Sequence, residues 1–577
     1  MDEGQITCYC LVTHPSQPLI LVREDDGGYQ CPAVSLPPRR LKFFPDYVPV
    51  INRGLRRELG LEVTVLRHLL DFGDDQVCLM EVHAECGDLP DGYVWLEAGE
   101  KTQWAGEASL RAWQAWNSLP GTDCSALAPW EQKGWFRAAA LWTQERLTEA
   151  GYSLIGPVVQ VKGAWSWSSL LRTETDQGAV YFKADYSHPP EEVSVILKLA
   201  KQWPRNVPQL IAADAGRNWM LMPDFGGESL ESLGTGDFVS AVSQFAQIQR
   251  STAREMPTWK SLGCPDRTAT ALMGLTDLLF ADTGILCGGE HGLSQAELAA
   301  LKRKKPLIAQ LLTSLASSAL PDTISSEDFK AGNVAVRDGQ FLFYDWSGTV
   351  ITHPFFGINY FLNRMVRKNS EDRFLWRADL QDAPRRAIVR AFLSEWAEYA
   401  SWEQRVAEFW VCRRLSPLYE AVRCYNDLAF IGTSSPWSAG TLANIPNSLR
   451  QFLAALEYQP INLMINTTIA ETLYFPFRLV SPAPGVERWA AGLLRLDPIS
   501  TPAVEFAAVP ADFAPAFAAA VGRGVLRSAE VNGLVGVCIT LLRLETDPID
   551  SKPSDYEMAG FQAIQAAIAA HGVPVSG

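Results

Sequence analysis

The sequence has few of the residues that build metal centres, and no segment suited to crossing a membrane. Among 577 residues there are only 7 histidines, and the 11 cysteines are scattered without zinc-ribbon spacing. Cys8 and Cys10 lie in an apolar, strand-like run that would place both thiols on one face. No apolar run approaches the ~20 residues of a membrane span, and the acidic start MDEGQ lacks the pattern of a signal peptide. We therefore expect a cytoplasmic protein with reduced cysteines and no membrane partner.

Basic residues are outnumbered by acidic ones. The chain has 50 Lys and Arg against 65 Asp and Glu, a formal charge of −15. This balance disfavours a nucleic-acid partner, which requires clustered cations. Hydrophobic residues make up 47% and charged residues 20% of the chain, as in a folded protein. At roughly 150 residues per domain the length predicts three to four domains. The phosphate loop G-x-x-x-x-G-K-[ST] is absent, which excludes a GTPase domain of that type.

Apolar periodicity divides the chain into three segments. The first combines short strands with one helix that Gly60 ends, and it opens with a hairpin. The middle segment is β-rich, then helical as far as about residue 458, with one strand pair inside the helical part. The third segment begins after about residue 460 and ends in an amphipathic helix. The expected strands are 6–12, 19–22, 63–65, 77–82, 334–336, 341–344 and 536–542, and the expected helices are 50–59, 129–147 and 556–571.

Oxygen-bearing side chains cluster in the middle segment. Asp328 and Asn333 belong to the run SSEDFKAGN, and Asp345 ends the strand after a turn at 338–339. Phosphoryl transfer needs a carboxylate to accept a hydroxyl proton, and an amide oxygen and a second carboxylate to hold Mg²⁺ against the triphosphate. A loop Asp, a following Asn and a strand-terminal Asp can supply these groups to one cleft. The alternative is a solvated loop whose Asp and Asn only form turns.

The residues before this cluster fit the same chemistry in chain order. The small-residue loop 163–169, which includes Ser168, can cover phosphates with backbone N–H groups. Lys183 ends the strand VYFK, where it can pair with the α- and β-phosphates. Glu191 or Glu192, at the start of the next helix, can hold this lysine, and Glu192 is favoured. Taken alone, Lys183 would be interpreted as a surface lysine; the order of the elements favours a nucleotide site.

With these motifs in place, residues 126–455 resemble the aminoglycoside phosphotransferase family of kinase-like enzymes, and we expect the domain to span 126–458. The resemblance rests on PWEQKGW from Pro129, VYFK ending at Lys183, DFKAGN from Asp328, FYDW ending at Trp346 and HPFF from His353. It implies a bilobal protein-kinase-like fold with ATP and Mg²⁺ as cofactors. The implied roles are Asp328 as catalytic base, Asn333 and Asp345 as magnesium ligands, Lys183 and Glu192 as a nucleotide-positioning ion pair, Met222 to Asp224 as the adenine hinge, and Lys330 as a cation for the γ-phosphate.

The chain departs from that family at one position beside the expected base. Ser326 stands where the family usually has a histidine that supports the catalytic loop. His353 is interpreted as structural rather than catalytic. The aromatic residues Trp396, Trp402, Trp410 and Tyr419 are interpreted mainly as helical core.

Residues 1–100 resemble a Nudix hydrolase, an α/β domain, in degenerate form. The expected signature helix keeps Arg53, Glu58 and Gly60, whereas Gly54 and Arg57 replace metal-binding glutamates. Hydrolysis is therefore not expected, and the domain is interpreted as structural or protein-binding. The basic patch Arg39, Arg40 and Lys42 is interpreted as a solvated loop, and residues 101–125 as a linker.

Residues 466–577 resemble domain IV of elongation factor G, an α+β domain like domain 2 of ribosomal protein S5. The match runs through RLDP from Arg495 and the stretch from Asn532 to Ser551, but the tip carries 481–485 and Asp547 in place of the expected residues. Residues 461–577 hold seven basic and eleven acidic residues, which disfavours binding to ribosomal RNA. The complete fold expected is thus an α+β multidomain protein.

The sequence leads to one main hypothesis and two alternatives. The main one is ATP- and Mg²⁺-dependent transfer of phosphate to a hydroxyl of a small molecule, an aminoglycoside-like compound being one candidate. Its acceptor pocket would lie between the Asp328 loop and the helical lobe 358–458. The alternatives are a catalytically impaired, kinase-like binding or scaffold protein, and a translation-associated factor acting through the C-terminal domain.

Overall fold

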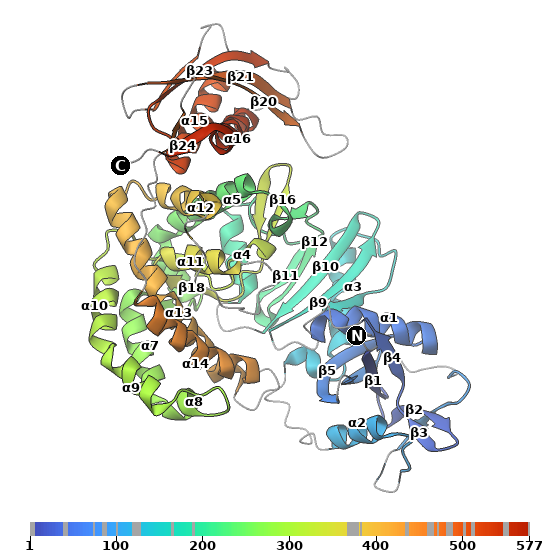
Figure 1. Cartoon of the computed structure of the whole chain (residues 1–577). Helices are drawn as coiled ribbons and strands as arrows, with labels where there is room; N and C mark the ends of the chain where they lie inside the picture. Colours follow the sequence, from blue (N-terminus) through green and yellow to red (C-terminus); the bar gives the residue numbers. More distant parts are fainter. Residues whose placement is uncertain are drawn as a thin grey trace. The chain divides into compact units, whose positions relative to one another are not determined.

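The computed structural model is organised as two compact units, each of which is described by itself (Figure 1). Unit 1 comprises Met1–Phe225 and Cys424–Leu442, and unit 2 comprises Gly226–Arg423 and Ala443–Gly577. The structure describes residues 6–37, 44–72, 75–83, 89–97, 99, 102–117, 128–162, 167–186, 191–365, 380, 383–432, 438–457, 467–469, 472–480, 489–499, 504–508, 514–545 and 553–574. The expected sites at 39–42, 163–166, 481–485 and 547–551 lie outside these residues.

Unit 1 begins with a seven-stranded mixed sheet flanked by two helices. Its central path is β3-β2-β1-β6-β5, in which β1 and β6 are parallel, while β4 and β7 pair with β1 and β2. The elements are β1 (Ile6–Thr13), β2 (Ile20–Asp25), β3 (Gly28–Gln30), β4 (Ala33–Leu36), α1 (Val48–Leu59), β5 (Val63–Phe72), β6 (Asp75–Val82), β7 (Tyr93–Leu96) and α2 (Glu107–Asn117). The four strands and the helix expected from the sequence of this segment are confirmed, as is the first hairpin.

Helix α1 packs its apolar face against β4 and β5, which leaves little room at Gly54. A Cβ atom on Gly54 would lie 2.6 Å from Cγ1 of Val34, so this helix surface leaves no room for a longer side chain. The helix ends at Gly60, whose left-handed φ of 67° suits glycine. Glu58 accepts a hydrogen bond of 2.8 Å from the Tyr93 hydroxyl. Gly54 and Glu58 therefore serve packing and hydrogen bonding in this helix.

A second sheet of unit 1 carries the upstream part of the expected nucleotide site. It is antiparallel with the order β11-β12-β10-β9-β8, and aromatic rings of α3 pack edge-on against Phe182 and Trp219. The elements are α3 (Trp135–Glu149), β8 (Val159–Lys162), β9 (Ser168–Thr175), β10 (Gly178–Asp185), α4 (Glu192–Ala200), β11 (Ala212–Asp214) and β12 (Trp219–Pro223). Residues 129–131, expected as the start of the long helix, instead form a separate 3₁₀ turn before it.

Buried polar side chains join these two sheets within unit 1. The amide group of Gln160 on β8 exchanges two hydrogen bonds of 3.0 Å with the backbone of Val65 on β5. Asn52 on α1 donates to the same Gln160 oxygen at 3.1 Å, and Glu81 accepts from the backbone N–H of Gly134 at 2.9 Å. The N-terminal sheet is therefore attached to the second sheet by specific hydrogen bonds as well as by the chain.

Unit 2 contains a helical lobe that holds two small three-stranded sheets, β13-β16-β17 and β14-β18-β15. Their strands bound two loops: residues 327–333 lie between β15 and β16, and residues 344–348 lie between β17 and β18. The elements are β13 (Glu228–Ser229), α5 (Thr235–Thr252), α6 (Met256–Ser261), β14 (Asp266–Arg267), α7 (Ala269–Ala281), α8 (Thr283–Cys287), α9 (Gln295–Arg303), α10 (Lys305–Ala316), β15 (Thr323–Ser326), β16 (Val334–Arg337), β17 (Gln340–Phe343), β18 (Thr349–Thr352), α11 (Phe355–Arg364), α12 (Ala383–Ser394), α13 (Trp402–Ile431) and α14 (Ser438–Ala455), the last two belonging partly to unit 1.

The C-terminal part of unit 2 is a four-stranded sheet, β20-β21-β23-β22, against which α15 and α16 pack. Its β22 and β23 are parallel, and α15 connects them. The elements are β19 (Thr467–Ile469), β20 (Leu473–Val480), β21 (Trp489–Pro498), β22 (Val504–Ala508), α15 (Pro515–Asn532), β23 (Val537–Glu545), α16 (Pro553–His571) and β24 (Gly572–Pro574). The expected last strand and last helix are confirmed, whereas the likeness to elongation factor G stays a prediction.

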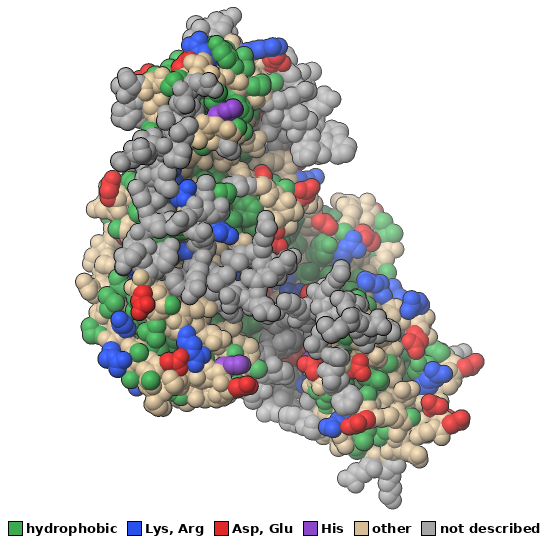
Figure 2. Space-filling view, in the orientation of Figure 1, with side chains coloured by type: hydrophobic (Ala, Val, Ile, Leu, Met, Phe, Trp, Pro, Cys, Tyr) green, Lys and Arg blue, Asp and Glu red, His purple; other side chains and the backbone are tan. Residues whose placement is uncertain are grey.

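None of the described helices is both long and apolar enough to cross a bilayer. On the face shown in Figure 2, Lys and Arg side chains are interspersed with Asp and Glu side chains. That face therefore presents no broad field of one sign among the residues that the structure describes.

Candidate functional site

The loop that follows β15 brings Asp328 and Asn333 together. Asn333 donates from Nδ2 to Oδ2 of Asp328 at 3.1 Å and to the Asp328 carbonyl at 3.0 Å. Lys330 donates from Nζ to the same carboxylate oxygen at 2.6 Å. The backbone N–H of Asp328 donates to Oγ of Ser326 at 3.1 Å. Ser326 therefore holds the first turn of this loop at the position where a histidine was expected.

Asp345 faces the same small cavity as Asp328 and Asn333. The three side chains belong to the lining of a space of about 200 Å³, together with aromatic residues of α5 and β17. The backbone of Asp345 has a left-handed φ of 61°, and its Oδ1 accepts from the Ser347 hydroxyl at 2.8 Å. The hairpin β16–β17 is what returns the chain from Asn333 to Asp345. The three residues predicted from spacing are thus gathered in one place.

The donor set of this cavity suits a hard divalent cation. Two carboxylates and one amide oxygen are the ligand types that Mg²⁺ prefers, and no soft ligand is among them. Asn333 is only 8% exposed, so its amide is held in place by the surrounding packing. The residues present therefore fit magnesium, with Asn333 and Asp345 as the candidate ligands.

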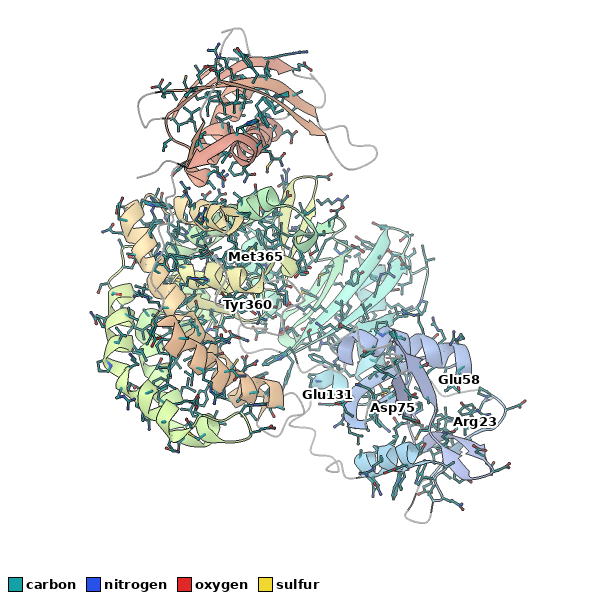
Figure 3. The ribbon with its side chains drawn as sticks, viewed as in Figure 1. Arg23, Glu58, Asp75, Glu131, Tyr360 and Met365 are labelled. Carbon is teal, nitrogen blue, oxygen red and sulfur yellow. The ribbon has the colours of Figure 1, made fainter. Side chains whose placement is uncertain are left out.

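Tyr360 is a functional candidate that the sequence reasoning missed. It lies on α11, where Figure 3 labels it, and its hydroxyl donates to Oδ1 of Asp328 at 2.9 Å. Burial, and then the charge of Asp328, raises the pKa of Tyr360 well above its usual range, so the hydroxyl remains a proton donor. Both carboxylate oxygens of Asp328 thus have hydrogen-bond donors. Only the i+4 spacing from Phe356 to Tyr360 in the HPFF helix pointed towards the site, and that signal is weak.

Next to Tyr360, unit 2 has a larger cavity, with about 690 Å³ of empty space that is partly open to solvent. It lies between the Ser325–Glu327 strand end and the helices α11, α13 and α14, the place expected for an acceptor pocket. Its lining is Ser325, Ser326, Glu327, Thr352, Phe356, Gly357, Tyr360, Asn363, Arg364, Ser416, Pro417, Tyr419, Glu420, Arg423, Ser448 and Gln451. We call it the α11 cavity.

Unit 1 holds the second group of predicted site residues. Nζ of Lys183, at the end of β10, lies 2.6 Å from Oε2 of Glu192, in the first turn of α4. The two side chains are 13% and 1% exposed. Asn218 accepts from the backbone N–H of Val193 at 3.2 Å and donates to the carbonyl of Asp185, so it ties α4 to β10. The structure therefore pairs Lys183 with the glutamate that was favoured over Glu191.

The remaining nucleotide candidates also lie on this sheet. Ser168 begins β9, opposite Asp185, and Met222 lies on β12, opposite Tyr181. The backbone N–H of Asp224 donates to the carbonyl of Ala179 at 2.9 Å, which continues the pairing past the end of β12. Ser168 on β9 and the Met222–Asp224 segment at the end of β12 thus lie on the two strands that flank β10, the strand of Lys183.

His353 is a core residue, as expected. Its ring is 1% exposed, with Nε2 at 3.3 Å from Glu408 and Nδ1 at 3.4 Å from the Cys412 thiol. Trp396 and Trp410 are likewise buried in the helical core, whereas Tyr419 lines the α11 cavity.

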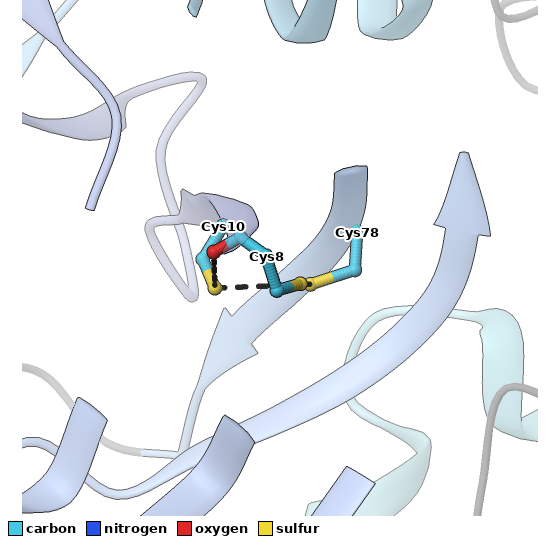
Figure 4. Close-up of side chains that lie close together, drawn as sticks. All are labelled: Cys8, Cys10 and Cys78. Carbon is cyan, nitrogen blue, oxygen red and sulfur yellow. Dashed lines mark hydrogen bonds between the residues drawn. The ribbon is translucent and has the colours of Figure 1, made fainter. Parts of the chain in front are cut away.

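Three buried thiols form a separate cluster in unit 1 (Figure 4). Sγ of Cys78 on β6 lies 3.4 Å from Sγ of Cys8 and 3.8 Å from Sγ of Cys10 on β1. All three are fully buried within an apolar core, and hydrogen bonds with Cys78 and Cys8, together with burial, raise the pKa of Cys10 well above its usual range. We interpret the cluster as core packing, because free cysteines behave there as small hydrophobic residues.

Comparison with known proteins finds a family match for the middle of the chain. Residues 158–402 match the phosphotransferase enzyme family. The predicted site residues from Ser168 to Asp345 and Tyr360 lie within this range, whereas the part of the α11 cavity contributed by residues 416–451 lies beyond it. No match was found among curated proteins. The class defined by these findings is a phosphotransferase acting on a hydroxyl group. More narrowly, residues 158–402 match the model of the phosphotransferase enzyme family, and the flanking segments lie outside that match.

Several solved structures are similar to this chain at low identity. A choline/ethanolamine kinase family protein from Mesorhizobium loti is 11% identical, with 55% of this chain and 95% of that chain covered, at a TM-score of 0.37. Choline kinase from Cryptosporidium parvum is 12% identical, with coverages of 52% and 88% and a TM-score of 0.36. A spectinomycin phosphotransferase complexed with ADP and spectinomycin is 10% identical, with coverages of 55% and 99% and a TM-score of 0.35. At these scores the likeness carries no conclusion about substrate.

Proposed function

We propose that the protein transfers the γ-phosphate of ATP to a hydroxyl group of a small molecule, with Mg²⁺ as cofactor. The observation that carries the proposal is the shared cavity of Asp328, Asn333 and Asp345. Phosphoryl transfer depends mainly on positioning and on neutralising charge, and this cavity offers the groups for both. The match of residues 158–402 to a phosphotransferase family supports the same reaction class.

Each candidate site residue of unit 2 has a distinct proposed role. Asp328 accepts the proton of the attacking hydroxyl, and Tyr360 and Asn333 hold its carboxylate in one orientation through their hydrogen bonds. Asn333 and Asp345 would hold Mg²⁺, which when bound neutralises phosphate charge. Lys330 is proposed to exchange its ion pair with Asp328 for the γ-phosphate.

The nucleotide is proposed to be held from unit 1 by the Lys183 sheet. Lys183, kept in place by Glu192, would pair with the α- and β-phosphates, and Ser168 would contact phosphate from the preceding loop. Met222 and Asp224 would meet adenine through backbone groups. Substitution of Lys183 should therefore weaken the binding of ATP.

The flanking domains and the finer substrate stay proposals as well. An aminoglycoside-like acceptor, the degenerate Nudix-like domain over 1–100 and the elongation factor G domain IV-like domain over 466–577 rest on sequence resemblance. The domain limits 101–125 and 126–458 and a cytoplasmic location have the same standing.

The direct test separates binding from transfer. Asp328→Asn keeps the size of the side chain but removes the base, so we expect the variant to bind ATP with Mg²⁺ while transfer falls by about 10²–10⁴-fold. Asp345→Asn should instead weaken the binding of Mg²⁺–ATP. If the wild-type chain neither binds ATP by calorimetry nor releases ADP with any acceptor, the proposal fails.

A catalytically impaired binding protein is the second candidate. One observation favours this candidate: Lys330 forms a 2.6 Å ion pair with Asp328, and this ion pair engages the carboxylate that is proposed to act as the base. This candidate predicts ATP binding without turnover in the wild-type chain. Turnover by the wild-type chain decides between the two: ADP release that depends on an acceptor excludes the binding protein, and Lys330→Met should then lower this release because the proposed function places Lys330 on the γ-phosphate.

A further inference from the structure

The ring of Phe245 helps to line the cavity that Asp328, Asn333 and Asp345 share. Phe245 lies on α5, a helix that precedes these three residues by a long stretch of chain, and it is only 1% exposed. A phenylalanine side chain has no polar atom, so it can neither hold Mg²⁺ nor accept a proton. Any contribution of Phe245 to the site must therefore pass through the groups that its ring contacts.

Beside the proposed base, the Phe245 ring stacks on Phe329, the residue that directly follows Asp328. The two ring centroids are 3.7 Å apart, and the ring planes differ by 10°. Phe361 of α11 also stacks on Phe329, with centroids 4.7 Å apart, and it directly follows Tyr360, the hydrogen-bond donor to Asp328. Aromatic pairs add a preferred geometry to the burial of apolar area. The chain at Asp328 is therefore anchored to α5 and α11 by rings as well as by hydrogen bonds.

Beside Asp345, a candidate magnesium ligand, the Phe245 ring stacks on Trp346, the residue that directly follows Asp345. The centroids are 6.1 Å apart, and the planes differ by 20°. Trp346 is 2% exposed, and its indole N–H donates to the carbonyl of Phe343 at 2.9 Å. Asp345 has a left-handed φ of 61°, a conformation that is unfavourable for aspartate and persists where the surrounding structure holds it. The buried Trp346 anchors the chain directly after this residue.

Helix α5 also holds the strand that leads into the Asp328 loop. Gln249 of α5 donates from Nε2 to the carbonyl of Ile324 on β15 at 3.3 Å. Oγ1 of Thr252, further along the helix, accepts from the N–H of the same residue at 3.3 Å. Helix α5 thus fixes the chain before Asp328 by hydrogen bonds and the chain after Asp328 by the Phe245 ring.

We infer that Phe245 is a positioning residue of the phosphotransferase site, because one ring fixes the residues that follow both Asp328 and Asp345. The inference rests on the proposed function and adds to it the group that keeps the proposed base and a proposed magnesium ligand in a constant relation. Removal of the ring should loosen Phe329 and Trp346 together. Asp345 should be affected most, since its left-handed backbone depends on the anchoring of Trp346, and the binding of Mg²⁺–ATP should weaken with it.

The test is calorimetric titration of the full chain with Mg²⁺–ATP, preceded by a thermal melt of each variant. Phe245→Leu keeps an apolar side chain but removes the ring, so we expect a Kd about tenfold weaker than that of the wild type. The matched control is Phe280→Leu on α7, the same change at a residue that is also 1% exposed but lies outside the described lining of the cavity. We expect this control to lose stability to a similar degree and to keep the wild-type Kd. If Phe245→Leu is unfolded at the titration temperature, Phe245→Met replaces it, because methionine is an adaptable filler of core space without a ring.

A double variant separates the ring stack from general packing. If the stack on Phe329 carries the effect, Phe245→Leu with Phe329→Leu should raise the Kd by less than the product of the two single effects, because both changes remove the same interaction. A Kd for Phe245→Leu equal to that of Phe280→Leu, or a double variant that shows the full product, would mean that Phe245 only fills the core, and the inference would be wrong. Absence of Mg²⁺–ATP binding by the wild-type chain would instead defeat the proposed function.

Discussion

Removal of Lys183 should leave a buried carboxylate without its cation. Glu192 is 1% exposed and its Oε2 lies 2.6 Å from Nζ of Lys183, so Lys183→Met exposes the full cost of burying Glu192. Breaking one partner of a buried ion pair typically costs about 3–5 kcal/mol, whereas replacing both partners by apolar groups is often neutral. We therefore expect Lys183→Met to destabilise this part of unit 1 by about 3 kcal/mol, and Lys183→Met with Glu192→Leu to recover most of it.

The assay is hydrogen exchange followed by mass spectrometry, because a chain with several domains does not unfold in one step. A loss of about 3 kcal/mol corresponds to a protection factor about a hundredfold lower for peptides that cover β10 and α4. Peptides from α9 in unit 2 serve as an internal control. If the double variant is as unprotected as the single one, removal of the Glu192 carboxylate restores no stability. That result would refute the reasoning about a coupled buried pair.

Three further predictions concern other parts of the molecule. Ser326→Ala removes the acceptor for the Asp328 N–H, so it should lower kcat with little change in the Kd for ATP and reduce the free energy of unfolding by about 1 kcal/mol. Ser326→Thr keeps a hydroxyl and should leave kcat and stability near those of the wild type. Gly54→Ala should destabilise unit 1 by about 1–3 kcal/mol, because the new Cβ atom would meet Val34. This is the opposite of the usual helix preference for alanine over glycine. Addition of Val34→Ala should reverse the loss of stability in a thermal melt. Burial, then the charge of Arg56, lowers the pKa of His83 from 6.5 to about 4. The stability that depends on neutral His83 is thus fully present above pH 6.5 and is lost as the pH falls towards 4, by up to about 3 kcal/mol. His83→Phe should therefore flatten the plot of unfolding free energy against pH between these values. An unchanged slope in His83→Phe would contradict this assignment.

The elements with strong local patterns were predictable from the sequence. Helix α1 follows from its apolar period and from Gly60, and β16–β17 follows from two short apolar runs on either side of a turn at Asp338 and Gly339. The pairing of Lys183 with Glu192, and the grouping of Asp328, Asn333 and Asp345, were predictable from the order of these residues in the chain. That order is meaningful because phosphoryl transfer requires these residue types together.

Several elements could not be predicted because their cause is tertiary. Strand β15 (Thr323–Ser326) is four residues long, rich in hydroxyl side chains and buried throughout, so its sequence has no alternation to detect. It is a strand because β18 pairs with it. The role of Gly54 depends on Val34 across the α1–β4 contact, and Tyr360 reaches Asp328 from 32 positions away. No local signal reports such distant partners.

The account depends most directly on the assignment of Asp345 as a ligand of Mg²⁺–ATP, and a matched pair of variants tests it. Asp345 and Asp338 both have left-handed φ values, 61° and 54°, which asparagine tolerates, so each can be changed to Asn without backbone strain. Calorimetric titration with Mg²⁺–ATP should show a Kd about 10–100-fold weaker for Asp345→Asn and a wild-type Kd for Asp338→Asn. Equal affinity of the two variants for Mg²⁺–ATP would contradict the account.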